Sequence, residues 1–207
     1  MMSIHQNQLP KKKKSEYKFL ILGVGGVGKT WVLESLKSKY GSVPGLESNQ
    51  IVPTVGLNLA RLEAIPHCLN GVCVFWDLGG RKSLRKIWNR YYTECDGLVF
   101  VVCDRDTDQT NKSLEEGIDE QVDVLKNLLK VEQLHGAPVL VLVNNDGNSQ
   151  IDLATIEDML DKSPRSLRAT NVVSMTPSSN SLDRGIKWLI ENTVSSVRTK
   201  ERIARAG

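Results

Sequence analysis

Several features that would place this chain in other classes of protein are missing from its sequence. No stretch approaches the roughly 20 apolar residues that a membrane-spanning helix needs, and the N-terminus has no apolar core of a secretory signal. Met2 stands where N-myristoylation requires a glycine. The cysteines form no Cys-x-x-Cys pair and no metal-ligand spacing, and the three scattered histidines add no metal signal. We therefore expect reduced thiols in a cytoplasmic protein.

Charge and length exclude further classes. The net charge of +3 is too small to indicate a nucleic-acid partner. A chain of 207 residues, 40% hydrophobic and 25% charged, fits one globular domain with a sizeable core. Residues 1–15 are polar and basic, and their Lys11–Lys14 run is open to two interpretations, a solvated tail or peripheral attraction to anionic lipid headgroups. Residues 198–207 form a second basic tail, which we expect to fray.

One motif carries a specific chemistry. Residues 23–30 read Gly23-Val24-Gly25-Gly26-Val27-Gly28-Lys29-Thr30 and directly follow the apolar run 17–22. A glycine-rich loop between a strand and a helix points backbone N–H groups and a helix N-terminus at a phosphate. Gly25, Gly26 and Gly28 allow the backbone to adopt conformations that a Cβ would obstruct. Lys29 is predicted to reach the β- and γ-phosphates, and the Thr30 hydroxyl to ligate Mg²⁺.

Strand and helix patterns alternate along the chain. Asn70-Gly71 predicts a tight hairpin turn between strands 57–64 and 71–77, and the alternation elsewhere predicts a mostly parallel six-stranded sheet with helices on both faces. The remaining strands are expected at 17–22, 97–103, 138–143 and 171–175, and helices at 30–40, 113–130, 152–161 and 182–197.

The segments between these elements resemble those of a known family. Pro53-Thr-Val-Gly-Leu-Asn58, Phe75-Trp-Asp-Leu-Gly-Gly80 and Ile87-Trp-Asn-Arg-Tyr-Tyr92 are similar to the switch I, switch II and following segments of the Arf and Arf-like small GTPases. Residues 16–30 and 91–97 resemble the Arf-related protein subgroup in particular. The similarity covers residues 16–197, which we take as a small GTPase G domain with the three-layer P-loop NTPase fold.

The resemblance implies a set of ligands and partners. GTP or GDP would bind with Mg²⁺; Thr54 would ligate the metal, Asp77 would hold it, and the Gly80 N–H would bond the γ-phosphate. An exchange factor, an activating protein and effectors are the expected partners. The subgroup also implies peripheral contact with Golgi membranes, although residues 1–10 do not indicate a strong membrane helix.

Three positions depart from the family pattern. Arg81 occupies the catalytic position where the family has the glutamine that orients the attacking water. In the base-recognition segment, Asn144 is retained and followed by Asn145 and Asp146, so the carboxylate comes one position early. Thr176 follows Met175 where the family has a serine-containing segment against the base.

The phosphate loop itself also differs from the Arf pattern. Gly25 stands in place of the usual Arf aspartate, which keeps the space beside the γ-phosphate open. Trp31 replaces a second threonine, and we expect its indole to pack against a neighbouring loop.

Taken together, the sequence predicts an Arf-related GTP-binding switch in membrane traffic with very slow intrinsic hydrolysis. Two alternatives stay open. The first is a pseudo-GTPase scaffold with altered nucleotide specificity, which the changes at positions 81 and 145–147 favour. The second is a P-loop phosphotransferase, for which the sequence has no arginine-rich lid insertion.

Overall fold

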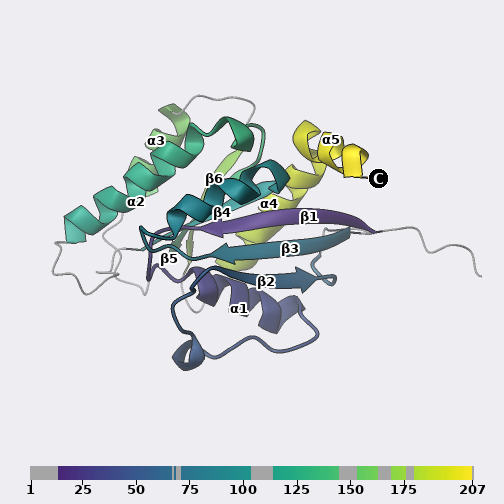
Figure 1. The fold of residues 1–207 in the computed structure, drawn as a ribbon, viewed down its shortest axis with the longest axis horizontal. Helices are drawn as coiled ribbons and strands as arrows, with labels where there is room; N and C mark the ends of the chain where they lie inside the picture. Colours follow the sequence, from purple (N-terminus) through teal and green to yellow (C-terminus); the bar gives the residue numbers. More distant parts are fainter. Residues whose placement is uncertain are drawn as a thin grey trace, which may run out of the picture.

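A six-stranded sheet forms the centre of the molecule (Figure 1). The computed structural model describes residues 14–66, 68, 71–103, 114–144, 153–162, 169–175 and 180–206. The strands are β1 (Ser15–Leu22), β2 (Leu57–Leu62), β3 (Gly71–Leu78), β4 (Gly97–Cys103), β5 (Val139–Asn144) and β6 (Thr170–Met175). Every residue of β3 and β4 is buried, as expected for central strands that are covered on both faces.

The strand order is β2-β3-β1-β4-β5-β6, and only β2 runs antiparallel to its neighbour. The predicted mostly parallel sheet is therefore confirmed. The predicted tight turn is wrong, because Gly71 is already the first residue of β3 and the last pair of the β2–β3 ladder joins Leu62 to Cys73. Asn70 lies outside the described residues.

Helices cover both faces of the sheet, as predicted. The α-helices are α1 (Lys29–Tyr40), α2 (Leu114–Leu129), α3 (Leu153–Lys162), α4 (Ser181–Ser195) and α5 (Val197–Ala206), and a long 3₁₀ segment, η2, spans Arg85–Glu94. One core cluster packs α1 and α4 against one face, and a second packs α2, α3 and η2 against the other. Figure 1 shows α1 below the sheet with α2 and α3 above it.

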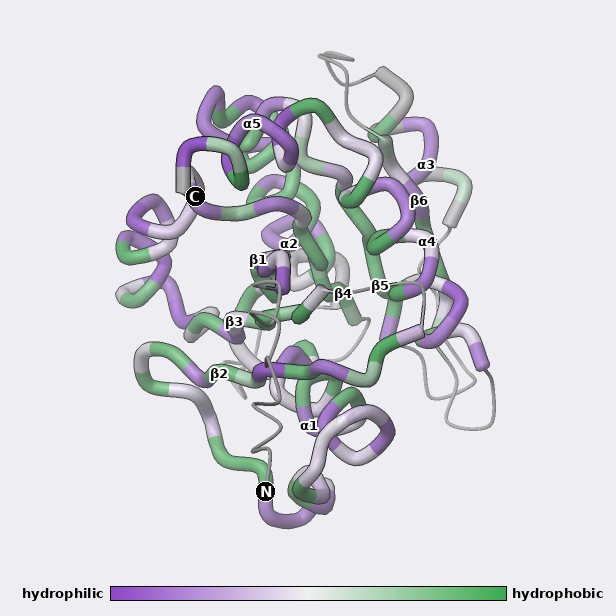
Figure 2. Tube along the Cα trace, turned by 90° about the vertical axis from the view of Figure 1, so that its right-hand side faces the viewer, coloured by the Kyte–Doolittle hydropathy of each residue, from purple (hydrophilic) through white to green (hydrophobic). Residues whose placement is uncertain are grey.

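The side chains of β1 illustrate how one strand contributes to both cores. Phe19 and Ile21 belong to the cluster under α1 and α4, whereas Leu20 and Leu22 belong to the other. This alternation follows from the two-residue period of a strand. Figure 2 shows that the tube is predominantly hydrophobic in the central strands β4 and β5. The result is a three-layer α/β fold.

The C-terminal segment differs from its prediction. Residues 198–207 were expected to fray, but Val197–Ala206 form α5, which packs on the molecule through two arginines. Arg198 donates from Nε to Cys95 O at 2.8 Å and from Nη2 to Tyr92 O at 2.6 Å. Arg202 pairs with the fully buried Asp96 at 2.5 Å. Two of the basic residues that suggested a solvated tail, Arg198 and Arg202, therefore attach this helix.

Among the described residues, none of the helices combines the length and the apolar character that crossing a membrane requires.

Candidate nucleotide and magnesium site

The glycine-rich loop lies between the end of β1 and the start of α1. The φ angles of Gly23, Gly26 and Gly28 are +149°, +76° and +95°, and Gly25 is not among the positive-φ glycines. Gly28 has a second constraint, because a Cβ there would clash with Asn144 Nδ2. The loop is thus shaped by left-handed backbone at Gly26 and Gly28 and by close packing against the end of β5. Val24 and Val27, the non-glycine members of the loop, are buried in the core.

Lys29 brings a positive charge into this loop. It is the first residue of α1, and only 6% of it is exposed. Its Nζ donates to Val24 O at 2.6 Å, so the ammonium is folded back over the loop. A cationic group held beside backbone N–H groups and a helix N-terminus is suited to binding a phosphate.

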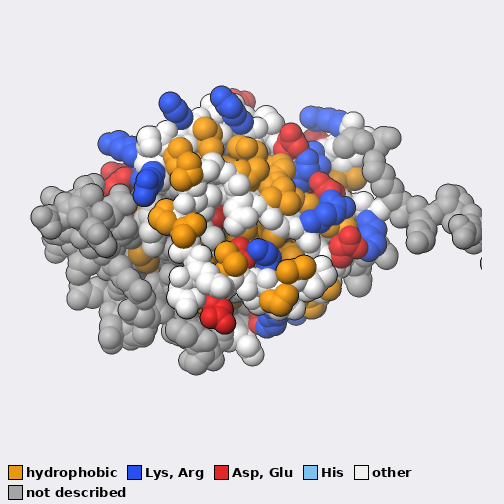
Figure 3. Space-filling model, turned by 60° about the horizontal axis from the view of Figure 1, so that its bottom comes forward, with side chains coloured by type: hydrophobic (Ala, Val, Ile, Leu, Met, Phe, Trp, Pro, Cys, Tyr) orange, Lys and Arg blue, Asp and Glu red, His pale blue; other side chains and the backbone are white. Residues whose placement is uncertain are grey.

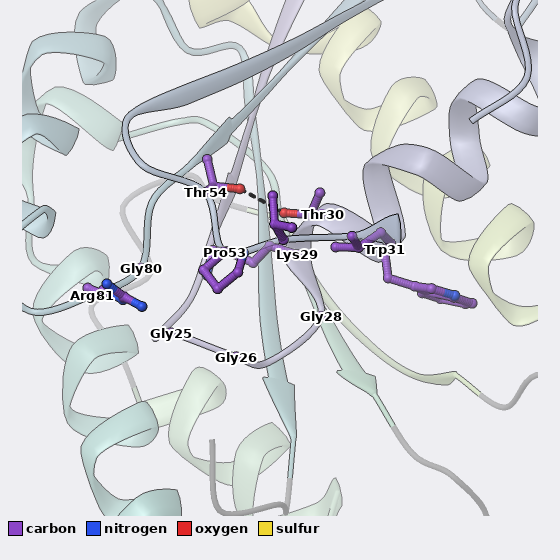
Figure 4. A pocket seen from close by; sticks show the side chains of 12 residues that line it. Gly25, Gly26, Gly28, Lys29, Thr30, Trp31, Pro53, Thr54, Gly80 and Arg81 are labelled. Carbon is purple, nitrogen blue, oxygen red and sulfur yellow. Dashed lines mark hydrogen bonds between the residues drawn. The ribbon is translucent and has the colours of Figure 1, made fainter. Parts of the chain in front are cut away.

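Three oxygen-bearing side chains meet next to Lys29, and Figure 4 shows two of them, those of Thr30 and Thr54. Thr30 Oγ1 donates to Asp77 Oδ2 at 2.6 Å and lies 2.9 Å from Thr54 Oγ1, which itself lies 3.1 Å from Asp77 Oδ2. Thr30 belongs to α1, Thr54 to the segment before β2, and Asp77 to the end of β3. Residues far apart in sequence therefore converge where the sequence predicted a metal.

The electrostatics of Asp77 fit a divalent cation. The carboxylate is fully buried, and its Oδ1 has no hydrogen-bond partner among the described residues. Burial raises the pKa of Asp77 above its ordinary value, although the hydroxyls of Thr30 and Thr54 and the charge of Lys29 oppose this. Hydroxyl and carboxylate oxygens are the ligands that Mg²⁺ accepts. The residues present thus fit Mg²⁺, which when bound would offset charge on phosphate oxygens.

Lys29, Thr30 and Thr54 border a cavity of about 510 Å³. The phosphate loop lies along one side, and the segments containing Thr54 and Gly80 lie along another (Figure 4). Figure 4 shows the Trp31 indole directed away from the Thr30–Thr54 pair, and the indole packs partly buried against the core. The lining residues are Gly25, Gly26, Gly28, Lys29, Thr30, Trp31, Ile51, Val52, Pro53, Thr54, Gly80 and Arg81.

Gly80 and Arg81 differ in how firmly they are held. A Cβ at Gly80 would clash with the carbonyl oxygens of Gly23 and Val24 and with Lys29 Nζ, so this glycine lies directly against the phosphate loop. Gly80 O accepts from Arg85 Nε at 2.8 Å. Arg81 is exposed at the rim, and its guanidinium makes no hydrogen bond to the described part of the chain. The residue in the catalytic position is therefore the less constrained of the two.

The base-recognition residues are described only in part. Asn144 ends β5, and its Nδ2 donates to Val27 O at 3.0 Å, which ties this strand end to the phosphate loop. Asn145, Asp146 and Thr176 lie outside the described residues. Their contacts with a base remain predictions.

Sequence reasoning missed the contacts that join the segment before β2 to the segment after β3. Gly79 N–H donates to Gly56 O at 2.9 Å, so the segment after β3 is bonded to the segment before β2. Trp88 Nε1 donates to Gly79 O at 3.0 Å. Trp88 stood in a segment that resembled the family, but nothing in its spacing indicated which backbone group it would reach.

Comparison with known proteins gives consistent findings. A sequence profile of the ADP-ribosylation factor family matches residues 1–193. ADP-ribosylation factor-like protein 3 of Saccharomyces cerevisiae is 33% identical over 184 residues, which cover 86% of each chain. Human ADP-ribosylation factor-related protein 1 is 30% identical over 195 residues, covering 92% of this chain and 91% of that one.

A solved structure shares the fold. The Arl6 BBS3 small GTPase from Trypanosoma brucei, determined with the bound nucleotide analogue GppNp, superimposes with a TM-score of 0.67. The match covers 87% of this chain and 98% of that one at 20% identity, so it supports the fold alone.

Proposed function

The chain belongs to the ADP-ribosylation factor family of small GTPases, and on that premise we propose that it is an Arf-related GTP-binding switch acting in intracellular membrane traffic. The observation that carries the proposal is the meeting of Thr30, Thr54 and Asp77. It joins a loop before β2 to the phosphate loop at one point. A loop held through a metal and a γ-phosphate is released when that phosphate is lost, and this gives two states.

The loop before β2 and the loop after β3 are joined by a hydrogen bond, as such a switch needs. Thr54 lies near Gly56, whose carbonyl accepts from Gly79 N–H in the other loop. Gly80, next in sequence, packs against the phosphate loop. A nucleotide that orders one segment therefore favours order in the other. Both would respond to the same phosphate.

Hydrolysis without a regulator is proposed to be very slow. A guanidinium has only donors, so Arg81 cannot accept a hydrogen bond from an attacking water as the family glutamine does. Its exposed position at the cavity rim, after the Gly79-Gly80 pair, gives it no fixed geometry for stabilising transition-state charge. The GTP-bound state would then be long-lived.

The pseudo-GTPase scaffold is retained as a second candidate because of specific residues. Arg81 removes the group that orients water, and Asn145 and Asp146 alter the sequence that selects guanine. A protein that binds nucleotide without completing a hydrolysis cycle would carry both changes.

Effector proteins are the proposed partners of the surface next to Thr54. Of the seven large apolar side chains exposed in the described part of the chain, six lie within residues 43–59. Figure 3 shows hydrophobic side chains spread over the face that α1 and β2 present. Exposed apolar side chains grouped in this way mark an interaction surface. An exchange factor and an activating protein would act on the neighbouring nucleotide site.

We place the protein in the cytoplasm, with peripheral contact on Golgi membranes. The support is the family assignment and the basic run Lys11–Lys14, which anionic headgroups would attract. Contact through lysines alone is weak and falls with salt. Liposome sedimentation of the wild type at low and high salt tests this placement.

The first experiment measures the affinities of the Mg²⁺-loaded protein for GTP, GDP and ATP by calorimetry. We expect a weakened but retained preference for guanine, because Asn144 keeps its contact with the phosphate loop. Replacement of Asp146 by Ala should reduce that preference. Equal binding of ATP and GTP, unaffected by Asp146→Ala, would favour the scaffold.

The second experiment follows GTP hydrolysis in a single turnover. Arg81→Gln should raise the rate about ten- to hundredfold if the position lacks only a group that orients water. Lys82→Gln removes a neighbouring exposed charge without changing position 81 and serves as the control. A fast wild-type rate that falls in Arg81→Gln would make Arg81 a catalytic residue and overturn the slow switch.

A further inference from the structure

Glu34 is a charged side chain in an unusual place. It lies in the middle of α1, and only 2% of its side chain is exposed. A buried carboxylate costs stability unless ionic and hydrogen-bonding partners compensate it. Its partners therefore indicate what it does.

Those partners lie on both sides of the loop that carries Thr54. Glu34 Oε2 accepts from the backbone N–H of Leu46 at 2.8 Å, and Glu34 Oε1 is within 3.5 Å of Asn58 Nδ2. Leu46 precedes Thr54 and Asn58 follows it as the second residue of β2. One carboxylate thus contacts both ends of residues 46–58.

Neighbouring contacts strengthen each end. Before Leu46, Gly45 packs so closely on α1 that a Cβ would clash with Glu34 O, and its N–H donates to Ser38 Oγ at 3.0 Å. At the other end, Asn58 is the cross-strand partner of Asp77 in the β2–β3 ladder. The contact between Glu34 and Asn58 therefore lies one strand away from Asp77, the carboxylate predicted to hold Mg²⁺.

Lys37 supplies the counter-charge. Its Nζ lies 2.9 Å from Oε1 and 2.7 Å from Oε2 of Glu34. Burial by itself would raise the pKa of Glu34, but the hydrogen bonds from Lys37 and from Leu46 N–H outweigh it and lower the pKa. Glu34 is therefore ionised at neutral pH and accepts hydrogen bonds with its full charge.

We propose that Glu34 is a positioning residue, which holds both ends of residues 46–58 so that Thr54 reaches Thr30 and Asp77. The proposal rests on the proposed nucleotide switch, because Thr54 acts only in the state that contains Mg²⁺ and a γ-phosphate. Glu34 is not among the residues that line the cavity. Its effect is on the fraction of molecules in which the Thr54 loop is in place.

The test compares Glu34→Gln, Glu34→Ala and the control Lys39→Ala. Affinities are measured for Mg²⁺ with a non-hydrolysable GTP analogue and for Mg²⁺ with GDP. Glu34→Ala should lower the ratio of GTP-analogue to GDP affinity about tenfold, since it removes hydrogen bonds to a charged group. Glu34→Gln keeps one acceptor oxygen and should lie between. Lys39→Ala removes an ion pair with Asp183 from the same helix and leaves the contacts of Glu34 with Lys37, Leu46 and Asn58, so it should keep the ratio within about twofold.

A purely structural role would give a different pattern. If Glu34→Ala left the ratio of the two affinities unchanged, whether or not it weakened the binding of both nucleotides, the proposal would be overturned. Thermal unfolding of each variant confirms that it is folded before titration.

Amide hydrogen exchange separates this proposal from the proposed function. In protein without added triphosphate, exchange of the Leu46 N–H should accelerate in Glu34→Ala and not in Lys39→Ala. Unchanged protection of the Leu46 N–H would refute the positioning role of Glu34 even if nucleotide binds well. A wild type that binds neither nucleotide would refute the proposed switch. The positioning role of Glu34 would still be judged by the exchange rate of the Leu46 N–H.

Discussion

Gly80, in the segment after β3, lies directly against the phosphate loop. Its missing side chain leaves room for two carbonyl oxygens of the loop and for the Lys29 ammonium. At this scale, single atoms decide whether the cavity keeps its shape. A change of one methyl group is therefore informative.

We predict that Gly80→Ala weakens binding of Mg²⁺-GTP by about tenfold or more, because the added Cβ displaces Lys29 Nζ from its place over the loop. Calorimetric titration measures the loss. The matched control is Gly117→Ala in α2, where a Cβ would meet nothing within 4 Å. That control should keep full affinity and gain about 0.5–1 kcal/mol of stability from its higher helix propensity. Equal affinities of the two variants would refute the packing argument.

Single residues of the site were predictable to different degrees. Thr30, Thr54 and Asp77 were found from sequence because each belongs to a linear motif, and the structure brings them together. Glu34 was not found, because its function depends on a backbone N–H twelve positions away, which no local pattern indicates. The roles predicted for Asn145 and Asp146 remain predictions.

At the scale of elements, α5 is a helix that the sequence did not indicate. The strands were predictable because runs of apolar residues bounded by turns are a local signal. The formation of α5 depends instead on Asp96 and on the carbonyl groups of Cys95 and Tyr92, which lie about a hundred positions away in sequence. A basic segment without those partners has the pattern of a solvated tail. Tertiary contacts decided the outcome.

We predict that Arg202→Ala lowers the free energy of unfolding by about 3 kcal/mol, because it leaves the buried Asp96 carboxylate without its counter-ion. Arg205→Ala on the same helix is the control, since its side chain is 81% exposed, and it should change stability by no more than about 0.5 kcal/mol. Urea unfolding measures both. Similar losses in the two variants would show that the Arg202–Asp96 ion pair has no special part in attaching α5.

At the scale of the whole molecule, ligand binding and stability are linked. A ligand that binds only the folded state raises its stability in proportion to the logarithm of ligand concentration over Kd. The cavity, the phosphate loop and both neighbouring segments exist only in the folded chain. Thermal unfolding therefore reports on nucleotide and metal together.

We predict that Mg²⁺-GTP at a hundred times its Kd raises the Tm by about 5–10 °C. Chelation of Mg²⁺ should remove most of the shift, because Thr30, Thr54 and Asp77 then hold no cation beside the phosphates. Lys29→Ala should also remove it, since the phosphate charge loses its buried partner. Lys39→Ala, which removes an ion pair with Asp183, is the control and should keep the shift. A Tm that is insensitive to chelation would contradict the metal site.

The docking of α5 has a consequence for how the protein is made. Arg202 Nη2 donates to Glu16 O at 2.6 Å, a contact between residues 186 positions apart. While a ribosome is still translating the segment before residue 202, the sheet and the nucleotide cavity have all their residues, yet Asp96 still has no guanidinium. A nascent chain at that stage retains an uncompensated buried charge and is exposed to chaperones and proteases. Translation of this one helix thus ends the period in which the newborn protein is vulnerable.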